Sequence, residues 1–402
     1  MKSAHDQTME TDSPPKIRIL MVSGGTGGHI FPALAVAEEL RRLGEASGSA
    51  PQIEFLGTHR PLEAKLIPAA GFPLRTVDAA GLKGIRGIQR LRNLWVLPRT
   101  AIAVAKILRG FRPHVVVGVG GYLAGPVMLE AALAGIPTLL IEPNARPGFT
   151  NRMLAPFVRI AVLGFAETTS VYGKKARVTG LPVRRAFFEI APRRSGPPVG
   201  VAQALLPVTG RTQPGVAVSP TLLIVGGSQG SRAINQALVK AVPLLFGGDA
   251  TRAGAMRIIH QTGEPDYNEV LKTYQEHGLM AEVHAFIDDM PGTLAQADLV
   301  ISRAGATALA ELAAAGRAAL LVPFPGAADQ HQLENARAVE KAGAARVVEQ
   351  SDLTPERLAK EIRELMASPA ALEKMETFAR TLARPDAAER IADLVEDLAR
   401  NS

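Results

Sequence analysis

The sequence predicts an α/β protein with two similar domains, whose parallel sheets face a central cleft. An apolar run over residues 17–22 indicates a buried strand, and it is followed by the glycine turn Gly24–His29 and a stretch, 31–43, with apolar residues at helical spacing. The same order of strand, glycine turn and helix returns over residues 221–245. The length of 402 residues suits two domains, each with a sizeable core. A glycine turn at a helix N-terminus exposes backbone amides, so both turns are expected to bind a phosphate or another anion.

Composition narrows the class of protein. The chain has no cysteine, which excludes disulfides, thiolate zinc sites and cysteine nucleophiles and fits a reducing compartment. Residues 1–15 are polar and lack the apolar core of a signal peptide, so we interpret them as a disordered tail. The very apolar region 115–141 carries Glu130 and two prolines, and a soluble α/β unit explains it better than a membrane span.

Charge is divided unevenly along the chain. Residues 1–200 contain 26 Lys and Arg against 13 Asp and Glu, whereas residues 201–402 contain 19 against 25. The basic excess therefore belongs to the first half and predicts an anionic partner for it, either nucleic acid or a membrane surface. Aromatic residues make up only 4% of the chain, which disfavours a nucleic-acid-binding module built on base stacking.

The first glycine turn does not fit the two commonest nucleotide motifs. A dinucleotide fold needs a third glycine where this chain has Ile30, and it needs an acid at the end of the second strand, where the strand 52–56 closes on Gly57. A P-loop is excluded because no glycine turn continues into Gly-Lys-Ser/Thr. The turn is therefore expected to serve another anionic ligand.

A basic segment follows between residues 81 and 112, without a single acid. Its apolar residues, from Leu82 to Leu97 and including the lone Trp95, recur at spacings of three and four. This pattern is typical of an amphipathic segment resting on an anionic membrane, and Leu82 to Arg112 is the membrane surface we expect. The alternative is a pair of helices that bury their apolar faces in the core and leave the arginines solvated. Its basic residues are Lys83, Arg86, Arg90, Arg92, Arg99, Lys106, Arg109 and Arg112.

A third glycine turn, Gly118–Tyr122, follows a valine-rich strand over 115–119, and a helix is expected over 125–133. The next strand, 138–141, ends in Glu142 and Asn144. Because ligands bind beyond the carboxyl ends of strands in an open parallel sheet, the first and third turns are expected to line one crevice.

The remaining chain predicts a connection and a second domain. Residues 192–220 are rich in Pro, Gly, Arg and Ser and are interpreted as an interdomain linker with an insertion. Strands are expected over 257–259, 299–301 and 319–322, and a loop is expected to carry Asp329, His331, Gln332 and Asn335. The segment from residue 370 is helical and charged.

Seven short motifs together resemble the MurG family of bacterial cell-wall glycosyltransferases, from Lys16 to the C-terminus. They are Gly24–His29, Gly120–Tyr122, Thr179–Arg184, Gly226–Gly230, Phe286–Met290, Ser302–Ala306 with Glu311, and His331 and Gln332 with Asn335. The resemblance implies a GT-B fold, in which two Rossmann-like domains enclose a cleft: an acceptor and membrane-facing domain over 16–191, a UDP-GlcNAc-binding domain over 221–369, and a helical segment over 370–402 that packs back on the first domain.

The resemblance also implies an activity. Members transfer GlcNAc from UDP-GlcNAc, with inversion, to the C4 hydroxyl of MurNAc in undecaprenyl-pyrophosphoryl-MurNAc-pentapeptide, which converts lipid I to lipid II in peptidoglycan synthesis. They act at the cytoplasmic face of the inner membrane as peripheral proteins, and other cell-wall synthesis and division proteins are implied partners. The alternatives are another GT-B glycolipid glycosyltransferase and a UDP-GlcNAc epimerase or hydrolase.

Site residues carry over by motif position. His29 is the implied general base, and an unperturbed histidine pKa near ~6.5 suits that role. Ser228 and the amides up to Gly230 would hold the diphosphate, Ile287 would meet uracil through its backbone, and Glu311 would bind the ribose hydroxyls. The implied donor-binding residues are Thr26, Gly27, Gly28, Asn144, Arg184, Ser228, Gln229, Gly230, Ile287, Ala306, Glu311, Gln332 and Asn335. The implied acceptor-binding residues are Gly120, Gly121, Tyr122, Glu142 and Asn151.

No cofactor is expected to be required, and a divalent cation is left as the open alternative. The chain lacks the Asp-x-Asp motif with which many sugar-nucleotide transferases hold a divalent cation, and Asp288 and Asp289 are expected to cap a helix rather than bind metal. Helix N-termini after Gly230 and Gly305 would stabilise the leaving UDP instead. Two motifs depart from the family pattern, at Ile141 and Pro143 where many members have His-Glu-Gln-Asn, and at Leu181 where they have Thr-Gly-Asn-Pro. Both lie near the expected acceptor site.

Overall fold

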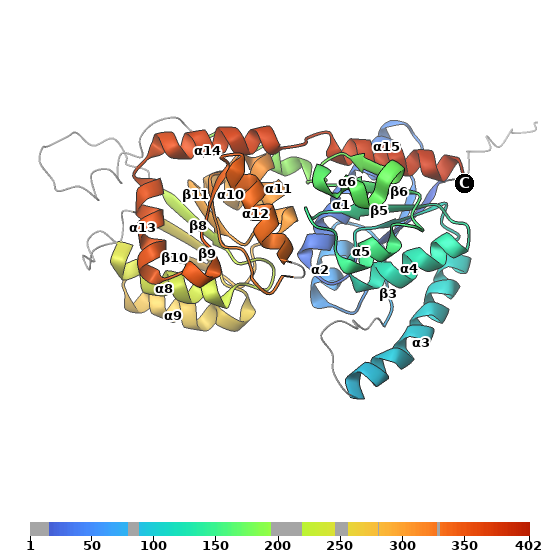
Figure 1. The fold of residues 1–402 in the computed structure, drawn as a ribbon, viewed down its shortest axis with the longest axis horizontal. Coiled ribbons are helices and arrows are strands. Elements are labelled where there is room, and N and C mark those ends of the chain that lie inside the picture. The colour runs from blue at the N-terminus through green and yellow to red at the C-terminus, as the bar shows by residue number, and fades with distance from the viewer. Residues whose placement is uncertain (1–15, 79–87, 194–218, 246–255, 280, 328–329) are drawn as a thin grey trace, which may run out of the picture.

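The computed structural model describes residues 16–78, 88–193, 219–245, 256–279, 281–327 and 330–402. Two lobes lie side by side, and the last two helices run along one edge across both of them (Figure 1). The predicted tail at 1–15 and most of the predicted linker, 194–218, lie outside the described residues. None of the described helices combines the length and the hydropathy needed to cross a membrane.

The first domain holds a parallel sheet of seven strands in the order β3-β2-β1-β4-β5-β6-β7. Its strands are β1 (Arg18–Val22), β2 (Gln52–Gly57), β3 (Leu74–Thr76), β4 (Val115–Gly118), β5 (Thr138–Glu142), β6 (Ile160–Leu163) and β7 (Ala176–Val178). Its helices are α1 (Gly27–Ala46), α2 (Pro61–Ala69), α3 (Ile88–Phe111), α4 (Gly121–Leu133), α5 (Phe149–Leu154) and α6 (Thr169–Tyr172). Apolar side chains from both faces of the sheet form two separate cores.

The second domain repeats the plan with six parallel strands in the order β10-β9-β8-β11-β12-β13. Its strands are β8 (Thr221–Val225), β9 (Arg257–Gln261), β10 (Ala281–His284), β11 (Leu299–Ser302), β12 (Ala319–Leu321) and β13 (Ala345–Val347). Its helices are α8 (Arg232–Leu245), α9 (Tyr267–Glu276), α10 (Met290–Gln296), α11 (Ala306–Ala315), α12 (His331–Lys341) and α13 (Pro355–Met366). The prediction of two similar α/β domains is confirmed.

The strand order explains where a ligand can bind. In each sheet the order reverses between the first strand and its later neighbour, at β1/β4 and at β8/β11. Such a reversal leaves a crevice beyond the carboxyl ends of the two strands, because their following helices cover opposite faces. The glycine turns after β1 and β8 both lie at these crevices.

Two helices close the chain. α14 (Pro369–Leu382) packs on the second domain, where Leu372 and Met375 join the core. α15 (Ala387–Arg400) returns to the first domain and buries Ile391, Ala392 and Val395 beside the core residues of α1. The C-terminal segment therefore connects the two domains along one edge (Figure 1).

Several element boundaries differ from the prediction. α1 begins at Gly27 and α4 begins at Gly121, so glycines expected on turns form the first helical turn instead. β9 extends to Gln261. The expected loop after β12 is also partly wrong, because His331, Gln332 and Asn335 lie on α12, whereas Asp329 lies outside the described residues.

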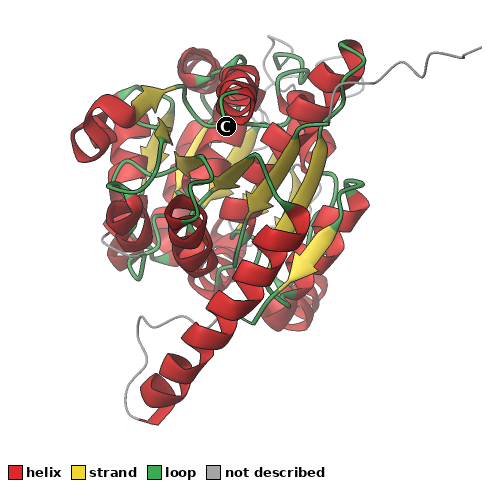
Figure 2. Cartoon of the chain, turned by 90° about the vertical axis from the view of Figure 1, so that its right-hand side faces the viewer, coloured by secondary structure: helices red, strands yellow, loops and turns green. Residues whose placement is uncertain are grey.

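The predicted membrane-facing segment is seen in part. Residues 79–87 lie outside the described residues, and the rest forms the single helix α3 rather than a pair of helices. The end of α3 is fixed to the domain by Val104, Leu108 and Phe111, which are buried in the core. Its other end extends away from the body of the protein (Figures 1 and 2).

Candidate active site

The glycine turns of the two domains face each other across the cleft. A Cβ atom placed on Gly27 would lie 3.7 Å from Cβ of Ser228. One residue further on, the carbonyl of Gly28 accepts a hydrogen bond of 3.0 Å from the Thr307 hydroxyl on α11. The N-termini of α1 and α11 therefore meet at the same place, and both direct partial positive charge toward the cleft.

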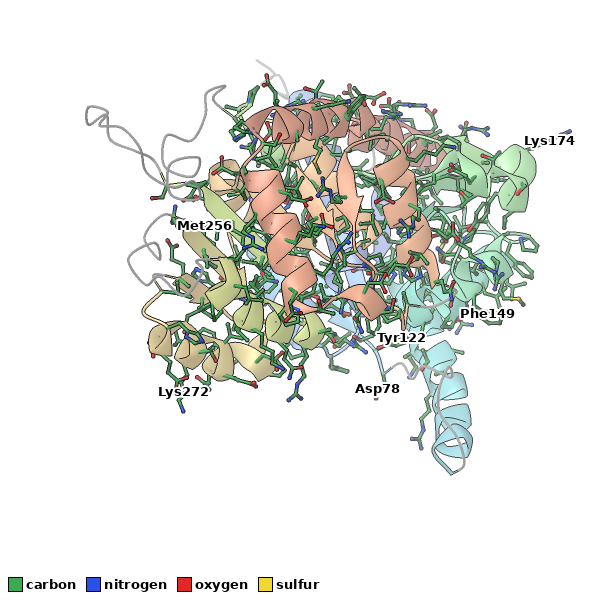
Figure 3. All side chains as sticks on the ribbon, turned by 60° about the vertical axis from the view of Figure 1, so that its left-hand side comes forward. Asp78, Tyr122, Phe149, Lys174, Met256 and Lys272 are labelled. Carbon is green, nitrogen blue, oxygen red and sulfur yellow. The ribbon has the colours of Figure 1, made fainter. Side chains whose placement is uncertain are left out.

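The third glycine turn joins the first one, as predicted. Gly120 and Gly121 have φ angles of 98° and 81°, which only glycine adopts easily. A Cβ on Gly121 would lie 2.6 Å from the carbonyl oxygen of Gly24, so this close approach also requires glycine. Tyr122 follows, with its ring under the guanidinium of Arg60 at 5.7 Å, and lies near the boundary between the two domains (Figure 3).

His29 lies at the end of the first glycine turn, in the first turn of α1, and its ring faces Gly121 of the third glycine turn. Burial lowers its pKa to about 4, and nearby His331 of the second domain lowers it further, while a hydrogen bond to the backbone of Gly24 acts in the opposite direction. The hydroxyl of Thr26 lies 3.5 Å from Nδ1. The imidazole is therefore neutral at pH 7 and has a lone pair to accept a proton. Its pKa is well below the unperturbed value that the sequence suggested.

Arg184 lies near enough to Glu311 for its positive charge to act on the carboxyl group. Burial raises the pKa of Glu311 to about 7, and the positive charge of Arg184 partly offsets this effect. The guanidinium of Arg184 lies 5.2 Å from the ring centres of both Phe31 and Phe187. Its buried Nε has no hydrogen-bond partner. A half-buried cation with an unused buried donor is suited to an anionic ligand.

The second glycine turn is held by the neighbouring turn after β9. Gly230 has a φ of 76°, and a Cβ there would lie 1.8 Å from the carbonyl oxygen of Thr262. Gln261 connects the turn to the predicted uracil site, since it donates to the carbonyl of Gly227 (2.8 Å) and accepts from the N–H of Ile287 (2.9 Å). Any backbone contact from Ile287 to a base would therefore come from its carbonyl. This role of Gln261 was not predicted, because its only signal in the sequence is its place at the end of a strand.

The predicted phosphate contacts lie close to these groups. Ser228 is half-buried and Gln229 is exposed, on the turn between β8 and α8. Ala306 is the first residue of α11, after the N-cap Gly305. Both predicted helix N-termini are thus present near the cleft.

Asn335 and Asn144 are brought together from different domains. Oδ1 of the fully buried Asn335 accepts from the N–H of Ala145 at 3.0 Å, and its Nδ2 lies 3.5 Å from Oδ1 of Asn144. Gln332 lies apart from this pair and accepts from the N–H of Phe324 at 3.0 Å. All three of these amides already have protein partners.

Glu142 lies beneath the predicted acceptor site rather than on its surface. Its side chain is fully buried and accepts hydrogen bonds from Asn144, from the N–H of Gly148 (3.3 Å) and from Nδ2 of Asn151 (2.8 Å). Burial raises its pKa. This geometry is that of a residue that shapes the loop after β5, and a direct contact of Glu142 with the acceptor stays a prediction. Asn151 is also buried, and its Oδ1 has no partner.

The two aspartates near the cleft behave differently. Asp289 accepts from the N–H of Gly292 at 2.9 Å and caps α10, as predicted. Asp288 does not cap the helix, because its carboxylate pairs with Lys65 of the first domain at 2.6 Å. Among the described residues, no cluster of three or more His, Asp or Glu side chains could hold a metal ion.

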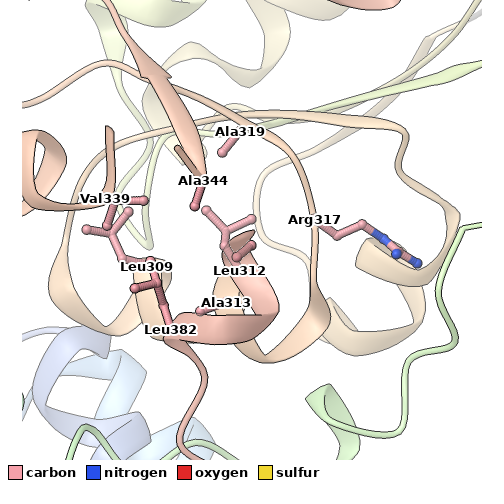
Figure 4. Close-up of a pocket in the computed structure, with 9 residues that line it drawn as sticks. Leu309, Leu312, Ala313, Arg317, Ala319, Val339, Ala344 and Leu382 are labelled. Atoms are coloured by element: carbon pink, nitrogen blue, oxygen red, sulfur yellow. The ribbon is translucent and has the colours of Figure 1, made fainter. Parts of the chain in front are cut away.

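A small pocket elsewhere in the second domain is apolar and separate from His29 (Figure 4). The guanidinium of Arg317 points away from the other lining side chains and donates to the carbonyls of Leu294 and Ala295. The pocket therefore offers no group that could bind a phosphate or activate a hydroxyl. It is lined by Leu309, Leu312, Ala313, Arg317, Ala319, Val339, Ala344, Ala379 and Leu382.

The chain matches two protein-family models. Residues 19–162 match the model of the glycosyltransferase family 28 N-terminal domain, and residues 221–391 match that of the family 28 C-terminal domain. The chain is 43% identical, over 96% of its length and 94% of the relative, to the UDP-N-acetylglucosamine–N-acetylmuramyl-(pentapeptide) pyrophosphoryl-undecaprenol N-acetylglucosamine transferase of Anaeromyxobacter sp. (strain Fw109-5). The enzyme of the same name from Solibacter usitatus is 40% identical, with 98% of this chain and 99% of the relative covered.

Solved structures agree. MurG of Acinetobacter baumannii superposes with a TM-score of 0.68 at 30% identity, over 95% of this chain and all of that chain. A putative UDP-N-acetylglucosamine 2-epimerase from Listeria monocytogenes has a TM-score of 0.65 at 13% identity, over 96% of this chain and 98% of that chain, and it shows the fold alone. With the two parallel sheets, these matches confirm the GT-B fold. The chain belongs to glycosyltransferase family 28, and within it to the MurG family of UDP-GlcNAc-dependent glycosyltransferases.

Proposed function

We propose that this protein transfers GlcNAc from UDP-GlcNAc to the C4 hydroxyl of MurNAc in undecaprenyl-pyrophosphoryl-MurNAc-pentapeptide, and so forms lipid II from lipid I in peptidoglycan synthesis. The relatives that match nearly the whole chain are named for this reaction. The observation that supports the chemistry most directly is the neutral His29 at the junction of three glycine turns.

In the proposed step, the acceptor hydroxyl attacks the anomeric carbon from the face opposite UDP, so the α-linkage is replaced by a β-linkage. His29 accepts the hydroxyl proton as the new carbon–oxygen bond forms. The bond from the anomeric carbon to the phosphate oxygen breaks, and UDP leaves with both electrons. Its growing negative charge faces the N-termini of α8 and α11 and the cationic Arg184.

We propose that these groups replace a divalent cation in the reaction. The proposal predicts that transfer continues in the presence of a chelator such as EDTA at close to its full rate. Loss of transfer on chelation, with recovery on adding Mg²⁺, would contradict it.

The activity is tested by transfer of labelled GlcNAc to a soluble-chain analogue of the lipid acceptor. Replacing His29 with Ala should lower kcat by roughly 10²- to 10⁴-fold, the usual contribution of a general base, while the Kd of UDP-GlcNAc stays unchanged. Replacing the exposed His277 with Ala is the matched control. Transfer by the His29→Ala variant at the wild-type rate would rule out the base role.

The same assay separates the alternatives. If the wild type binds UDP-GlcNAc but releases free UDP or an epimerised sugar without using the acceptor, the protein is a GT-B hydrolase or epimerase. If it transfers GlcNAc to a different lipid, the acceptor assignment is wrong and the transferase assignment stands.

Peripheral attachment to the cytoplasmic face of the inner membrane is part of the proposal, with α3 and the residues before it resting on anionic lipid. The first end of this helix extends away from the domain (Figure 2). Nearer the domain, the side chain of Ile102 is 59% exposed, between the basic residues Arg99 and Lys106 in the sequence. We expect binding to vesicles that contain phosphatidylglycerol, weakened by high salt. Equal binding to purely zwitterionic vesicles would contradict the charge-based attachment.

A further inference from the structure

One peptide group connects two side chains from different helices at the first glycine turn. The N–H of Gly25 donates to Oε1 of Glu63, on α2, at 2.7 Å. The carbonyl of the same peptide belongs to Gly24, and the His29 ring lies beside it: a Cβ on Gly121 would lie 2.6 Å from this carbonyl oxygen and 3.7 Å from Cε1 of His29. The backbone of Gly24 also raises the pKa of the imidazole, which is the effect of a carbonyl that accepts from a ring N–H.

The surroundings of Glu63 are built to hold a carboxylate. Its side chain is fully buried, and its contacts come from donors: the N–H of Gly25, the N–H of Thr58 and the hydroxyl of Thr58 at 3.0 Å and 3.1 Å. An ionised carboxylate accepts hydrogen bonds and donates none, so it matches such a set. Gly57 leaves room for it, because a Cβ there would lie 2.5 Å from Oε2. No ion pair with Glu63 is seen among the described residues.

A second contact fixes the turn from the other side. Nη1 of Arg60 donates to the carbonyl oxygen of Gly25 at 3.0 Å. Gly25 itself has a φ of 106°, a conformation that glycine adopts readily. Glu63 and Arg60, three residues apart at the start of α2, therefore hold both polar groups of Gly25.

We propose that Glu63 is a positioning residue for His29, and that it acts through the peptide group between Gly24 and Gly25. This inference rests on the proposed function, in which His29 is the general base. Hydrogen bonds in a chain polarise one another, so a carboxylate on the N–H makes the opposite carbonyl a stronger acceptor. The ring nitrogen that faces Gly24 then keeps its proton, and the other nitrogen keeps the lone pair that accepts the proton of the acceptor hydroxyl. Glu63 thus selects the tautomer and the orientation of the base without touching a substrate.

The experiment is a double-mutant cycle on kcat with the acceptor analogue. We expect Glu63→Gln to lower kcat roughly 10- to 100-fold, the scale of a misplaced catalytic group, with the Kd of UDP-GlcNAc unchanged within about twofold. The same change in a His29→Ala background should cost nothing further, because the two residues act through one path. If Glu63→Gln lowers kcat by the same factor in the wild type and in His29→Ala, the proposal is overturned. The matched control is Glu54→Gln, which removes another buried carboxylate of this domain, paired with Arg75 on the neighbouring strand.

Two further measurements keep the result clear. Nitrogen-15 NMR of the His29 ring at pH 7 should show one dominant tautomer in the wild type and a mixture in Glu63→Gln; an unchanged spectrum overturns the proposal. If Glu63→Gln does not fold, Gly57→Ala displaces the carboxylate without removing it. This variant should likewise lower kcat and give a mixture of His29 tautomers. If His29→Ala is fully active, the base role fails; if it is impaired while Glu63→Gln behaves like Glu54→Gln, only the positioning role fails.

Discussion

Oδ1 of the fully buried Asn335 lies 3.0 Å from the backbone nitrogen of the half-buried Ala145, and this hydrogen bond joins the second domain to the first. The loop that carries Ala145 is itself shaped by Glu142, which accepts from Asn144, Gly148 and Asn151. The domain boundary therefore depends on a polar network between the end of β5 and the start of α12, rather than on apolar packing alone.

Replacing Asn335 with Ala should weaken this boundary. The change removes the partner of the half-buried N–H of Ala145, and a typical hydrogen bond contributes about 0.5–1.5 kcal/mol. We expect a lower midpoint of thermal unfolding and a higher KM for UDP-GlcNAc, because the two domains no longer hold the cleft in one geometry. Asn235→Ala is the control, since Asn235 is equally buried but bonds only within the second domain. A higher KM in the control but not in Asn335→Ala would contradict this explanation.

Glu311 should make stability depend on pH. Burial raises its pKa from 4.5 to about 7, so the folded protein keeps a proton that the unfolded chain releases. This group therefore increases the free energy of unfolding below pH ~4.5, and the increase disappears as the pH rises through about 7. The change is a few kcal/mol at most, since one pKa unit corresponds to about 1.4 kcal/mol.

Urea unfolding of the protein without ligand, between pH 4.5 and 8, measures this effect. Glu311→Gln should remove the decline in the free energy of unfolding over that window, whereas Glu356→Gln, at an exposed position on α13, should leave it in place. A decline of the same size in Glu311→Gln and in the wild type would show that another group is responsible.

The main elements could be predicted because strands in buried parallel sheets are continuous apolar runs, and β1, β4 and β8 are of this kind. The starts of α1 at Gly27 and of α4 at Gly121 could not be predicted. Glycine adopts many backbone conformations and is normally taken to indicate a turn, so it gives no signal for a helix. The start of α12 was missed for a similar reason: its first turn is polar and follows a proline-rich stretch.

The candidate site was only partly visible in the sequence. Motifs identified His29, Arg184 and Glu311, but burial set the pKa values of His29 and Glu311, and burial depends on the whole fold. The role of Gln261 was hidden because its partners are a backbone carbonyl and a backbone N–H from distant turns. Such contacts leave no local pattern in a single sequence.

The glycine at position 230 should be indispensable for nucleotide binding. Ala at this position must keep a φ of 76° and would place its Cβ 1.8 Å from the carbonyl oxygen of Thr262, so the turn has to move. We expect loss of UDP binding, measured by calorimetry. Gly278→Ala provides the control: its φ is 65° but nothing lies within 4 Å of the added Cβ. It should lose roughly 1 kcal/mol of stability from the backbone conformation alone and should bind UDP normally. Normal binding by Gly230→Ala would remove the second turn from the nucleotide site.

The C-terminal helix should stabilise the domain at the other end of the chain. Ile391 of α15 is fully buried in the core of the first domain that also contains the apolar residues of α1. The Ile391→Ala substitution should therefore lower the free energy of unfolding by about 2–5 kcal/mol, the usual range for a buried isoleucine truncated to alanine. Because α15 packs on α1, the loss should appear as faster amide hydrogen exchange in β1, β2 and β4, with the second sheet unchanged. Ile362 of α13 is buried in the core of the second domain. Ile362→Ala should therefore speed exchange in the second sheet and leave the first sheet unchanged. If exchange in the first sheet is the same in Ile391→Ala and in the wild type, α15 does not pack there in solution, and the residues after Leu382 could be removed without loss of the fold.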